Sequence, residues 1–238
     1  MELIQGKKVL ITGSSGFIGS SLFSALEETN EVVGVDLIPP KFRRNGVNLV
    51  GDLLDHSTLG KALDTKPEVI FHLAAQSSAE ISMAYPVYDN RNNRDLGIGL
   101  LRELDSRGFD GRLVFASSMA VYGESPTKGS KENDPLRPVS IYGNNKKLLE
   151  RAIQESGLDY RIIRLFNCYG PGQTLENTKQ GMVRIFLRQL LENPAKVVVK
   201  GSVNRVRDFL FIQDAVKIFI ASGAQSDFPE VANACTGV

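Results

Sequence analysis

The chain has 238 residues, of which 42% are hydrophobic, 23% charged and 8% aromatic. These proportions are ordinary for a globular protein and exclude a disordered or collagen-like chain. Because the formal net charge is only +1, the chain as a whole does not attract nucleic acid or an acidic membrane.

The two cysteines, Cys168 and Cys235, lack the spacing of a metal site or a redox motif. A disulfide between them is compatible with the sequence, although we expect two free thiols. The N-terminus has no apolar segment of signal-peptide length. No apolar run approaches the roughly 20 residues that span a bilayer. We therefore predict a cytoplasmic protein with no metal site, no nucleic-acid partner and no membrane partner.

Strands and helices alternate along the first two thirds of the chain. Short apolar runs predict strands at 9–11, 32–35, 49–50, 69–71, 113–115 and 160–165. Helical spacing or composition predicts helices at 17–26, in a segment that ends at residue 63, at 88–104 and at 142–155. This order predicts an α/β fold with a Rossmann-type, doubly wound parallel sheet.

The residues that follow these strands are small or polar. In a doubly wound sheet, ligands bind in the crevice outside the carboxyl ends of the strands. The residues expected beside that crevice are Gly13, Asp36, Asp52, Ala74, Ser117 and Leu165. They are far apart in the sequence, so their convergence indicates one binding site.

The alternation stops after Gly170-Pro171-Gly172. Beyond this point we expect a helix at 183–191, a strand at 197–199 and a helix near 214–221. We therefore divide the chain into a first domain, residues 1–170, and a partial second lobe, residues 171–238.

Three glycines, Gly13, Gly16 and Gly19, join the first expected strand to the first helix in the order G-x-x-G-x-x-G. Gly13 permits a tight turn, Gly16 lets the backbone approach a pyrophosphate, and Gly19 allows close packing of helix and strand. The helix N-terminus adds unpaired N–H groups and the positive end of its dipole. A plain strand-to-helix turn is the alternative, but this position in the chain favours a dinucleotide site.

Asp36 ends the second expected strand, 17 residues after Gly19. A carboxylate there accepts hydrogen bonds from both ribose hydroxyls and repels a 2′-phosphate, which favours NAD over NADP. The alternative is a turn aspartate before Pro39-Pro40. Arg43 and Arg44 would admit NADP if their loop folded back.

Asp52 and Leu53 follow the third expected strand. Asp52 could hold the adenine amino group while Leu53 packs against its ring. An N-cap role for Asp52 or Asp55 in the next helix is the alternative.

Tyr142 and Lys146 lie four residues apart on one face of a predicted helix. Free tyrosine ionises near pH 10, which is too high for a base at neutral pH. A buried lysine and the positive nicotinamide of NAD would both lower the pKa of the phenol. Y-x-x-x-K is common as a surface pair, but Ser118 lies upstream at the end of a strand. Ser118 could hold a substrate hydroxyl there or cap the turn that follows.

Together these features resemble the extended short-chain dehydrogenase/reductases, in their NAD-dependent nucleotide-sugar epimerase/dehydratase branch. The resemblance runs from residue 7 to about residue 237, in the family's order. The shared segments are Thr12 to Gly19, Gly51-Asp52-Leu53, His72-Leu73-Ala74-Ala75, Ser117 to Gly123, Tyr142 with Lys146, Arg164 to Gly172, Arg207-Asp208-Phe209 and Ile212-Gln213-Asp214-Ala215.

This resemblance implies roles for single residues. Tyr142 would be the general acid/base, Lys146 would lower its pKa and bind the nicotinamide ribose, and Ser118 would orient the sugar hydroxyl. Asn167 and Arg207 would meet the diphosphate of a nucleotide-sugar substrate. The implied NAD-site residues are Gly13, Gly16, Phe17, Ile18, Gly19, Asp36, Asp52, Leu53, Leu73, Ala74, Ala75, Ser117, Tyr142, Lys146 and Phe166.

Arg207 has a structural alternative, an ion pair with Asp208 or Asp214. The family also implies a homodimer formed through the helices near 88–104 and 142–155. Leu148, Leu149, Ala152 and Ile153 offer apolar surface for such a contact, but they would serve equally as core residues.

The sequence also departs from the family pattern. Dehydratases carry an acidic pair where this chain has Met119 and Ala120, and related decarboxylases usually carry a glutamate at the second of these positions. The family's asparagine before Gly97 aligns poorly, because Asn93 is shifted by one position. Val203 stands where a second glycine is usual. Family members continue beyond residue 237, so we expect part of the sugar-binding lobe to be missing.

The main functional hypothesis is therefore a nucleotide-sugar 4-epimerase that uses NAD. The first alternative is an NAD(P)H-dependent reductase of a nucleotide-linked keto-sugar, with the same three catalytic residues. The second is a non-catalytic NAD-binding module that contacts a partner.

Overall fold

The computed structural model describes residues 4–124, 129–174, 181–199 and 201–237. Over these residues, its centre is a seven-stranded sheet in the order β3-β2-β1-β4-β5-β6-β9, and every neighbouring pair is parallel. The strands are β1 Lys8–Thr12, β2 Glu31–Asp36, β3 Val47–Val50, β4 Val69–His72, β5 Arg112–Ser118, β6 Asp159–Leu165 and β9 Val231–Ala234. The predicted doubly wound parallel sheet is confirmed.

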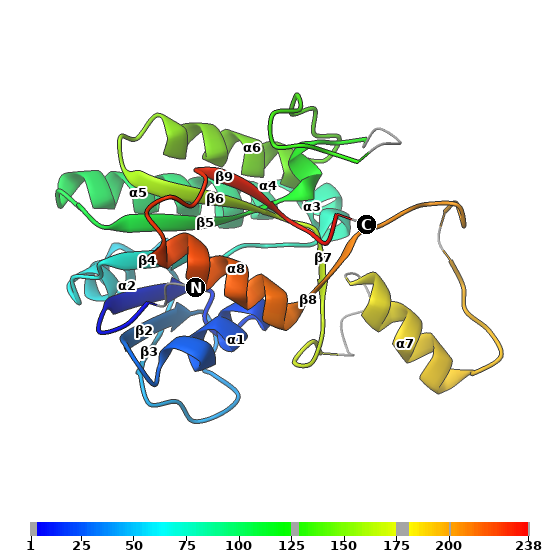
Figure 1. The fold of residues 1–238 in the computed structure, drawn as a ribbon, viewed down its shortest axis with the longest axis horizontal. Helices are drawn as coiled ribbons and strands as arrows, with labels where there is room; N and C mark the ends of the chain where they lie inside the picture. Colours follow the sequence, from blue (N-terminus) through cyan, green and yellow to red (C-terminus); the bar gives the residue numbers. More distant parts are fainter. Residues whose placement is uncertain (1–3, 125–128, 175–180, 200, 238) are drawn as a thin grey trace.

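Helices cover both faces of this sheet (Figure 1). One face packs against α1 Phe17–Leu26 and α8 Ile212–Ala224, around the buried rings of Phe23, Phe71 and Phe219. The other face packs against α2 His56–Leu63, α5 Leu96–Ser106 and α6 Ile141–Gln154. The two layers leave the carboxyl ends of the strands open for a ligand site.

The helix expected at 88–104 is confirmed, but it contains a π-helical turn. After the short helix α3 Ala79–Ala84, the helix α4 Pro86–Asn90, the π-helical turn Arg91–Asp95 and α5 follow one another without a break. A π-helical turn adds a residue to the helical repeat. It explains the shifted spacing between Asn93 and Gly97. Asn93 is buried there, and a Cβ atom on Gly97 would lie 2.2 Å from Leu149 of α6.

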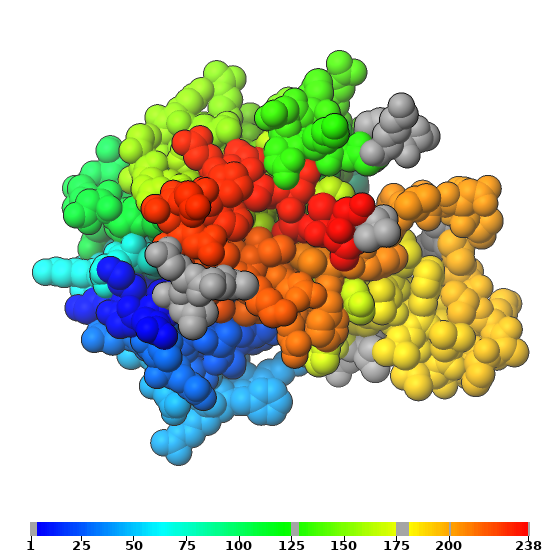
Figure 2. Space-filling model, in the orientation of Figure 1, coloured from blue at the N-terminus to red at the C-terminus, as the bar shows by residue number. Residues whose placement is uncertain are grey.

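The segment after residue 170 contains less regular structure than expected. Two short strands, β7 Asn167–Tyr169 and β8 Phe209–Phe211, pair in parallel, and α7 Met182–Glu192 projects from the body with the chain that follows it (Figures 1 and 2). The strand expected at 197–199 is wrong. Its residues are exposed and irregular, and the Val198 N–H donates to the Gln189 side chain at 2.6 Å instead of to a strand.

The division at residue 170 also needs correction. Helix α8 belongs to the core on one face of the sheet, and β9 pairs with β6 at its edge. The chain therefore leaves the main body after β7 and returns to it with β8. Of the described residues after 170, α8 and β9 therefore belong to the main body.

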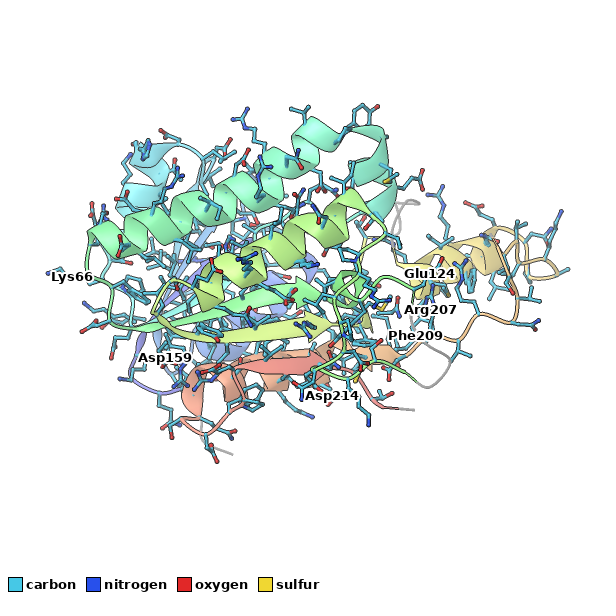
Figure 3. The ribbon with its side chains drawn as sticks, turned by 90° about the horizontal axis from the view of Figure 1, so that it is seen from above. Lys66, Glu124, Asp159, Arg207, Phe209 and Asp214 are labelled. Atoms are coloured by element: carbon cyan, nitrogen blue, oxygen red, sulfur yellow. The ribbon has the colours of Figure 1, made fainter. Side chains whose placement is uncertain are left out.

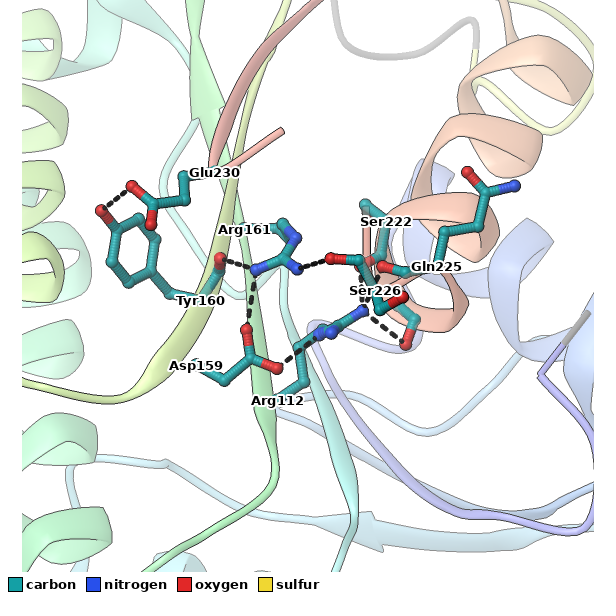
Figure 4. A network of polar contacts seen from close by, with 9 residues as sticks. Arg112, Asp159, Tyr160, Arg161, Ser222, Gln225, Ser226 and Glu230 are labelled. Atoms are coloured by element: carbon teal, nitrogen blue, oxygen red, sulfur yellow. Dashed lines mark hydrogen bonds and ion pairs between the residues drawn. The ribbon is translucent and has the colours of Figure 1, made fainter. Parts of the chain in front are cut away.

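Two arginines tie the end of α8 to the sheet (Figure 4). Arg112 donates from Nη1 to the carbonyls of Ser222, Gly223 and Gln225, the last at 2.6 Å, as a cation capping a helix C-terminus. Asp159 bridges Arg112 and Arg161 at 2.8 and 2.7 Å. In Figure 3, Asp159 lies at the end of the sheet away from Arg207, so this cluster anchors α8 remote from the crevice.

Candidate active site

A cavity of about 630 Å³ lies at the carboxyl ends of the strands. Every predicted site residue except Arg207 lines it. These residues are Gly13, Gly16, Phe17, Ile18, Gly19, Asp36, Asp52, Leu53, Leu73, Ala74, Ala75, Ser117, Ser118, Tyr142, Lys146, Phe166 and Asn167. Segments that are distant in the sequence therefore meet in one pocket, as the positions of the strand ends predict.

At the glycine turn, the main chain passes very close to neighbouring main-chain atoms. Gly13 has a φ of +71°, and a Cβ atom there would lie 2.7 Å from the Ala74 nitrogen at the end of β4. A Cβ atom on Gly19 would lie 2.1 Å from the Gly13 oxygen. The N-cap of α1 is Gly16, and no side chain caps its first turn. The N-terminal N–H groups of α1 thus remain available for an anion such as a pyrophosphate.

Asp36 fixes the glycine turn and also borders the cavity. Its carboxylate accepts hydrogen bonds from the Ser15 N–H at 2.9 Å and the Ile38 N–H at 3.2 Å. A carboxylate has about four lone-pair positions, so it can still accept bonds from ribose hydroxyls. The Arg44 guanidinium lies 4.5 Å from the centre of the Phe23 ring and does not line the cavity. This arrangement fits NAD.

The two aspartates beside β3 have separate roles. Asp55 is the N-cap of α2 and accepts hydrogen bonds from the Ser57 and Thr58 N–H groups. Asp52 accepts from the Leu54 N–H at 2.9 Å and lines the cavity with Leu53. The N-cap role therefore belongs to Asp55, and Asp52 remains available for the adenine end of a dinucleotide.

Local structure brings Tyr142 against Ser118. Ser140 caps α6 by accepting a hydrogen bond from the Gly143 N–H at 3.0 Å, which puts Tyr142 in the first turn. Gly143 lets that turn approach the main chain after β5, because a Cβ atom there would lie 2.4 Å from the Ala120 oxygen. The Ser118 hydroxyl is hydrogen-bonded to the Tyr142 phenol and also accepts from the Ala120 N–H. Ser118 thus caps the turn as predicted, whereas its role in holding a substrate hydroxyl stays a prediction.

The two titratable groups of this set are buried. Burial raises the pKa of Tyr142 to about 12, although the hydrogen bond from Ser118 opposes this shift. Burial lowers the pKa of Lys146 to about 8. The protein alone therefore does not lower the pKa of the phenol as we expected from the lysine, because burial raises this pKa and the negative charge of Asp89 raises it further.

The two predicted substrate residues lie in different surroundings. Asn167 lines the cavity and donates from Nδ2 to the Asp208 carbonyl at 2.8 Å. Arg207 lies outside the cavity lining, at the end of the sheet from which α7 projects (Figure 3). The structural alternative for Arg207, an ion pair with Asp208 or Asp214, is not formed. Asp208 instead accepts hydrogen bonds from Thr236 and Gly237, and Asp214 pairs with Lys217 at 2.9 Å.

Sequence reasoning missed several buried polar residues behind the cavity. Glu150 and Arg164 form an ion pair at 2.7 Å, and Ser117 donates a short hydrogen bond to Glu150. A helical signal exists for Glu150, because it lies four residues after Lys146 on the same face. Asp89 is fully buried beside Asn145, and no sequence spacing indicates this contact.

Both cysteines are free thiols, as expected. Among the described residues, no cluster of His, Cys, Asp or Glu could hold a metal ion. No helix in the described ranges is long and apolar enough to span a bilayer. The described side chains that carry charge into the cavity are Asp36, Asp52 and Lys146.

The chain matches the model of the NAD dependent epimerase/dehydratase family over residues 9–235. It is 34% identical over 220 residues to a putative UDP-glucose 4-epimerase of Methanocaldococcus jannaschii, which covers 88% of this chain and 71% of that protein.

Two solved structures are also similar. The UDP-N-acetylglucosamine 4-epimerase from Methanobrevibacter ruminantium, in complex with UDP-N-acetylmuramic acid, is 30% identical with a TM-score of 0.89, over 99% of this chain and 78% of that one. The UDP-glucose 4-epimerase of Thermus thermophilus, in complex with NAD, is 30% identical with a TM-score of 0.84, over 97% and 78% of the two chains.

Proposed function

This chain belongs to the NAD-dependent epimerase/dehydratase family, and we propose that it is a nucleotide-sugar 4-epimerase. It is an enzyme of that family, and NAD is its cofactor. The observation that carries the proposal is the meeting of Ser118, Tyr142 and Lys146 in one cavity with the glycine turn. A non-catalytic NAD-binding module would not need these three residues.

The residues that would hold NAD fit its parts. The glycine turn and the uncapped N-terminus of α1 would bind the pyrophosphate, and Asp36 would bind the adenosine ribose. NAD, when bound, supplies the nicotinamide that exchanges a hydride with C4 of the sugar, and its positive charge favours the Tyr142 phenolate.

The chain's own residues move and hold one proton. Ser118 orients the 4-hydroxyl, and Tyr142 as phenolate accepts the hydroxyl proton while C4 is oxidised to a ketone. The 4-keto sugar then turns over in the pocket. Tyr142 returns the proton to the oxygen when C4 is reduced from the other face. Lys146, as an ammonium ion, stabilises the phenolate throughout this cycle.

The side chains after Ser118 favour epimerisation over water loss or decarboxylation. Met119 and Ala120 line the cavity and cannot donate or accept a proton. A dehydratase needs a further acid to protonate the departing hydroxyl. We therefore propose that the 4-keto sugar is returned to the hexose level without loss of a group.

The test is to load the purified protein with NAD and incubate it with UDP-glucose, UDP-galactose and their N-acetylhexosamine counterparts. We expect interconversion of a 4-epimer pair, followed by proton NMR of the anomeric signals, with no net change in NADH absorbance. Tyr142→Phe, which keeps the ring and removes the phenol, is the matched control. In a second incubation, with NADH or NADPH and a nucleotide-linked 4-keto sugar, net consumption of the reduced cofactor would instead support the keto-sugar reductase. Four unchanged sugars in the first incubation would overturn the proposal.

We also propose a homodimer. Leu149 and Ile153 belong to the core, whereas Leu148 is 42% exposed on α6. Analytical ultracentrifugation of the wild-type protein and of Leu148→Lys tests whether this face joins two copies. A wild-type monomer would contradict the dimer.

A further inference from the structure

Asp89 is a fully buried carboxylate at the end of α4. Its oxygens accept hydrogen bonds from three side-chain amides, those of Gln76 at 2.7 Å, Asn93 at 2.9 Å and Asn145 at 2.7 Å. Within the described chain, no lysine or arginine forms an ion pair with it. A buried carboxylate whose side-chain hydrogen bonds come from neutral amides keeps a desolvation cost, which a nearby positive charge offsets.

The charge of Asp89 acts on the lysine of the catalytic set. Two buried carboxylates, Asp89 and Glu150, act on Lys146. Glu150 is already neutralised, because it forms a close ion pair with Arg164 at 2.7 Å. Lys146 itself donates to the Ala116 carbonyl, which carries no net charge. The negative charge of Asp89 is thus left to act on the ammonium ion, and the same charge raises the pKa of the Tyr142 phenol.

Asp89 also holds the helix that carries the catalytic residues. Asn145 lies between Tyr142 and Lys146 in the sequence. It is only 2% exposed, so it lies on the buried face of α6. Its Nδ2 donates both to Asp89 at 2.7 Å and to Asn90 Oδ1 at 2.8 Å. The first two turns of α6 are therefore fastened to the end of α4.

We propose that Asp89 is a positioning residue for the catalytic set: through Asn145 it fixes the start of α6, and its charge stabilises the ammonium form of Lys146. Burial alone lowers the pKa of Lys146, and the charges of Asp89 and Glu150 oppose that shift and leave it at about 8. The titratable groups around Lys146 are Tyr142 and Glu150 on α6, Asp89 on α4 and His72 on β4. The inference rests on the proposed role of Lys146, but its test needs no sugar substrate.

The experiment is an NMR titration of the Lys146 side chain in the full-length protein without substrate, with the signal assigned by its loss in Lys146→Met. In the wild-type protein, we expect Lys146 to be mostly an ammonium ion at pH 7. In Asp89→Asn, which keeps the shape and removes the charge, the midpoint should fall by about one pH unit or more. An unchanged midpoint in a folded variant would overturn the electrostatic role. If the Asp89→Asn variant does not fold, the wild-type protein alone tests the electrostatic role. A neutral Lys146 amine at pH 7 would then overturn it.

The variant Asn145→Ala tests the positioning role of Asp89 separately from its electrostatic role. This variant keeps the Asp89 carboxylate and removes the amide link, so the midpoint of Lys146 should stay near the wild-type value while its chemical shift changes. Asn144→Ala, at the exposed neighbouring position, is the matched control and should change neither. A Lys146 chemical shift in Asn145→Ala equal to that of the wild-type protein would overturn the positioning role. Neither result depends on whether the protein epimerises a sugar.

Discussion

Lys146 donates a hydrogen bond from Nζ to the main-chain carbonyl of Ala116 at 2.9 Å. This bond ties the lysine on α6 to β5 just before Ser117 and Ser118, so the helix and the strand hold the catalytic set as one unit. The same ammonium group lies 5.8 Å from the centre of the Tyr142 ring. The Lys146 side chain therefore both holds α6 against β5 and places a positive charge near the Tyr142 ring.

Lys146→Met should lower turnover by about 100-fold or more, because it removes the charge that we propose stabilises the phenolate. Methionine fills a similar buried volume but leaves the Asp89 carboxylate without the positive charge beside it, so the midpoint of thermal unfolding should also fall. Lys147→Met is the matched control. Lys147 also donates to a main-chain carbonyl, that of Leu136 at 2.9 Å, but does not line the cavity. Equal turnover in the two variants would refute the role of Lys146.

Gly19→Ala should abolish NAD binding and destabilise the protein, because its Cβ atom would lie 2.1 Å from the Gly13 oxygen. The glycine turn would have to move away from the pyrophosphate position. Gly99→Ala on α5 is the control. A Cβ atom there meets nothing within 4 Å, and alanine should stabilise that helix by about 0.5–1 kcal/mol. Calorimetric titration with NAD and thermal unfolding measure both effects, and NAD binding by Gly19→Ala at wild-type affinity would contradict the argument.

Asp36→Asn should weaken NAD binding about tenfold or more and reduce the preference for NAD over NADP. An asparagine side chain has one accepting oxygen where the carboxylate has two, so it cannot accept from both ribose hydroxyls in the same way. It also carries no charge that would repel a 2′-phosphate. The dissociation constants of NAD and NADP, measured for both proteins, give the change in preference. Asp55→Asn is the matched substitution, because Asp55 caps α2 outside the cavity. An unaltered NAD/NADP ratio in Asp36→Asn would remove Asp36 from the proposed cofactor site.

Much of the fold follows from local sequence. Helix α1 begins and ends where helical spacing predicts, because apolar residues and the glycine turn are both local signals. The residues at the strand ends converge because parallel strands share one direction. The cavity could therefore be predicted from strand ends alone.

The remaining features depend on tertiary contacts. The π-helical turn at Arg91–Asp95 brings Asn93 to Asp89, and that carboxylate bonds to a residue of α6 that is 56 positions away. The valines at 197–199 have strand propensity but no neighbouring strand among the described residues. The pairing of β9 with β6 at the sheet edge joins segments that are far apart in the sequence, so local periodicity does not predict it.

The stability of the protein should fall as the pH falls from 6.5 towards 3, in part because of His72. Burial lowers the pKa of this imidazole to about 3, and its Nδ1 lies 2.8 Å from the Thr12 hydroxyl oxygen. That oxygen accepts from the Leu73 and Ala74 N–H groups, so its hydrogen is left for Nδ1 and the ring is neutral. The folded state therefore binds fewer protons than the unfolded state in this range, and acid favours unfolding.

His72→Asn removes this titration. The free energy of unfolding of the wild-type protein should drop relative to that of the variant by up to about 1.4 kcal/mol per pH unit below 6.5. Urea unfolding at pH 7, 6 and 5 measures the difference. A difference that stays constant across these three pH values would mean that His72 is not buried in its neutral form.

Glu150→Gln should destabilise the protein by about 3–5 kcal/mol, because it leaves the Arg164 cation buried without its counter-charge. The two side chains are 2% and 4% exposed, and Arg164 also bonds to the Tyr122 hydroxyl at 2.9 Å. Replacing both partners, as Glu150→Met with Arg164→Met, should restore part of the loss, since no buried charge is then unpaired. Glu155→Gln breaks an exposed ion pair with Arg151 at the end of the same helix and should cause no measurable change. Urea unfolding of the four proteins forms the test. A double variant that is less stable than Glu150→Gln would contradict this expectation. It would show that the two side chains stabilise the fold in a further way, beyond neutralising each other's charge.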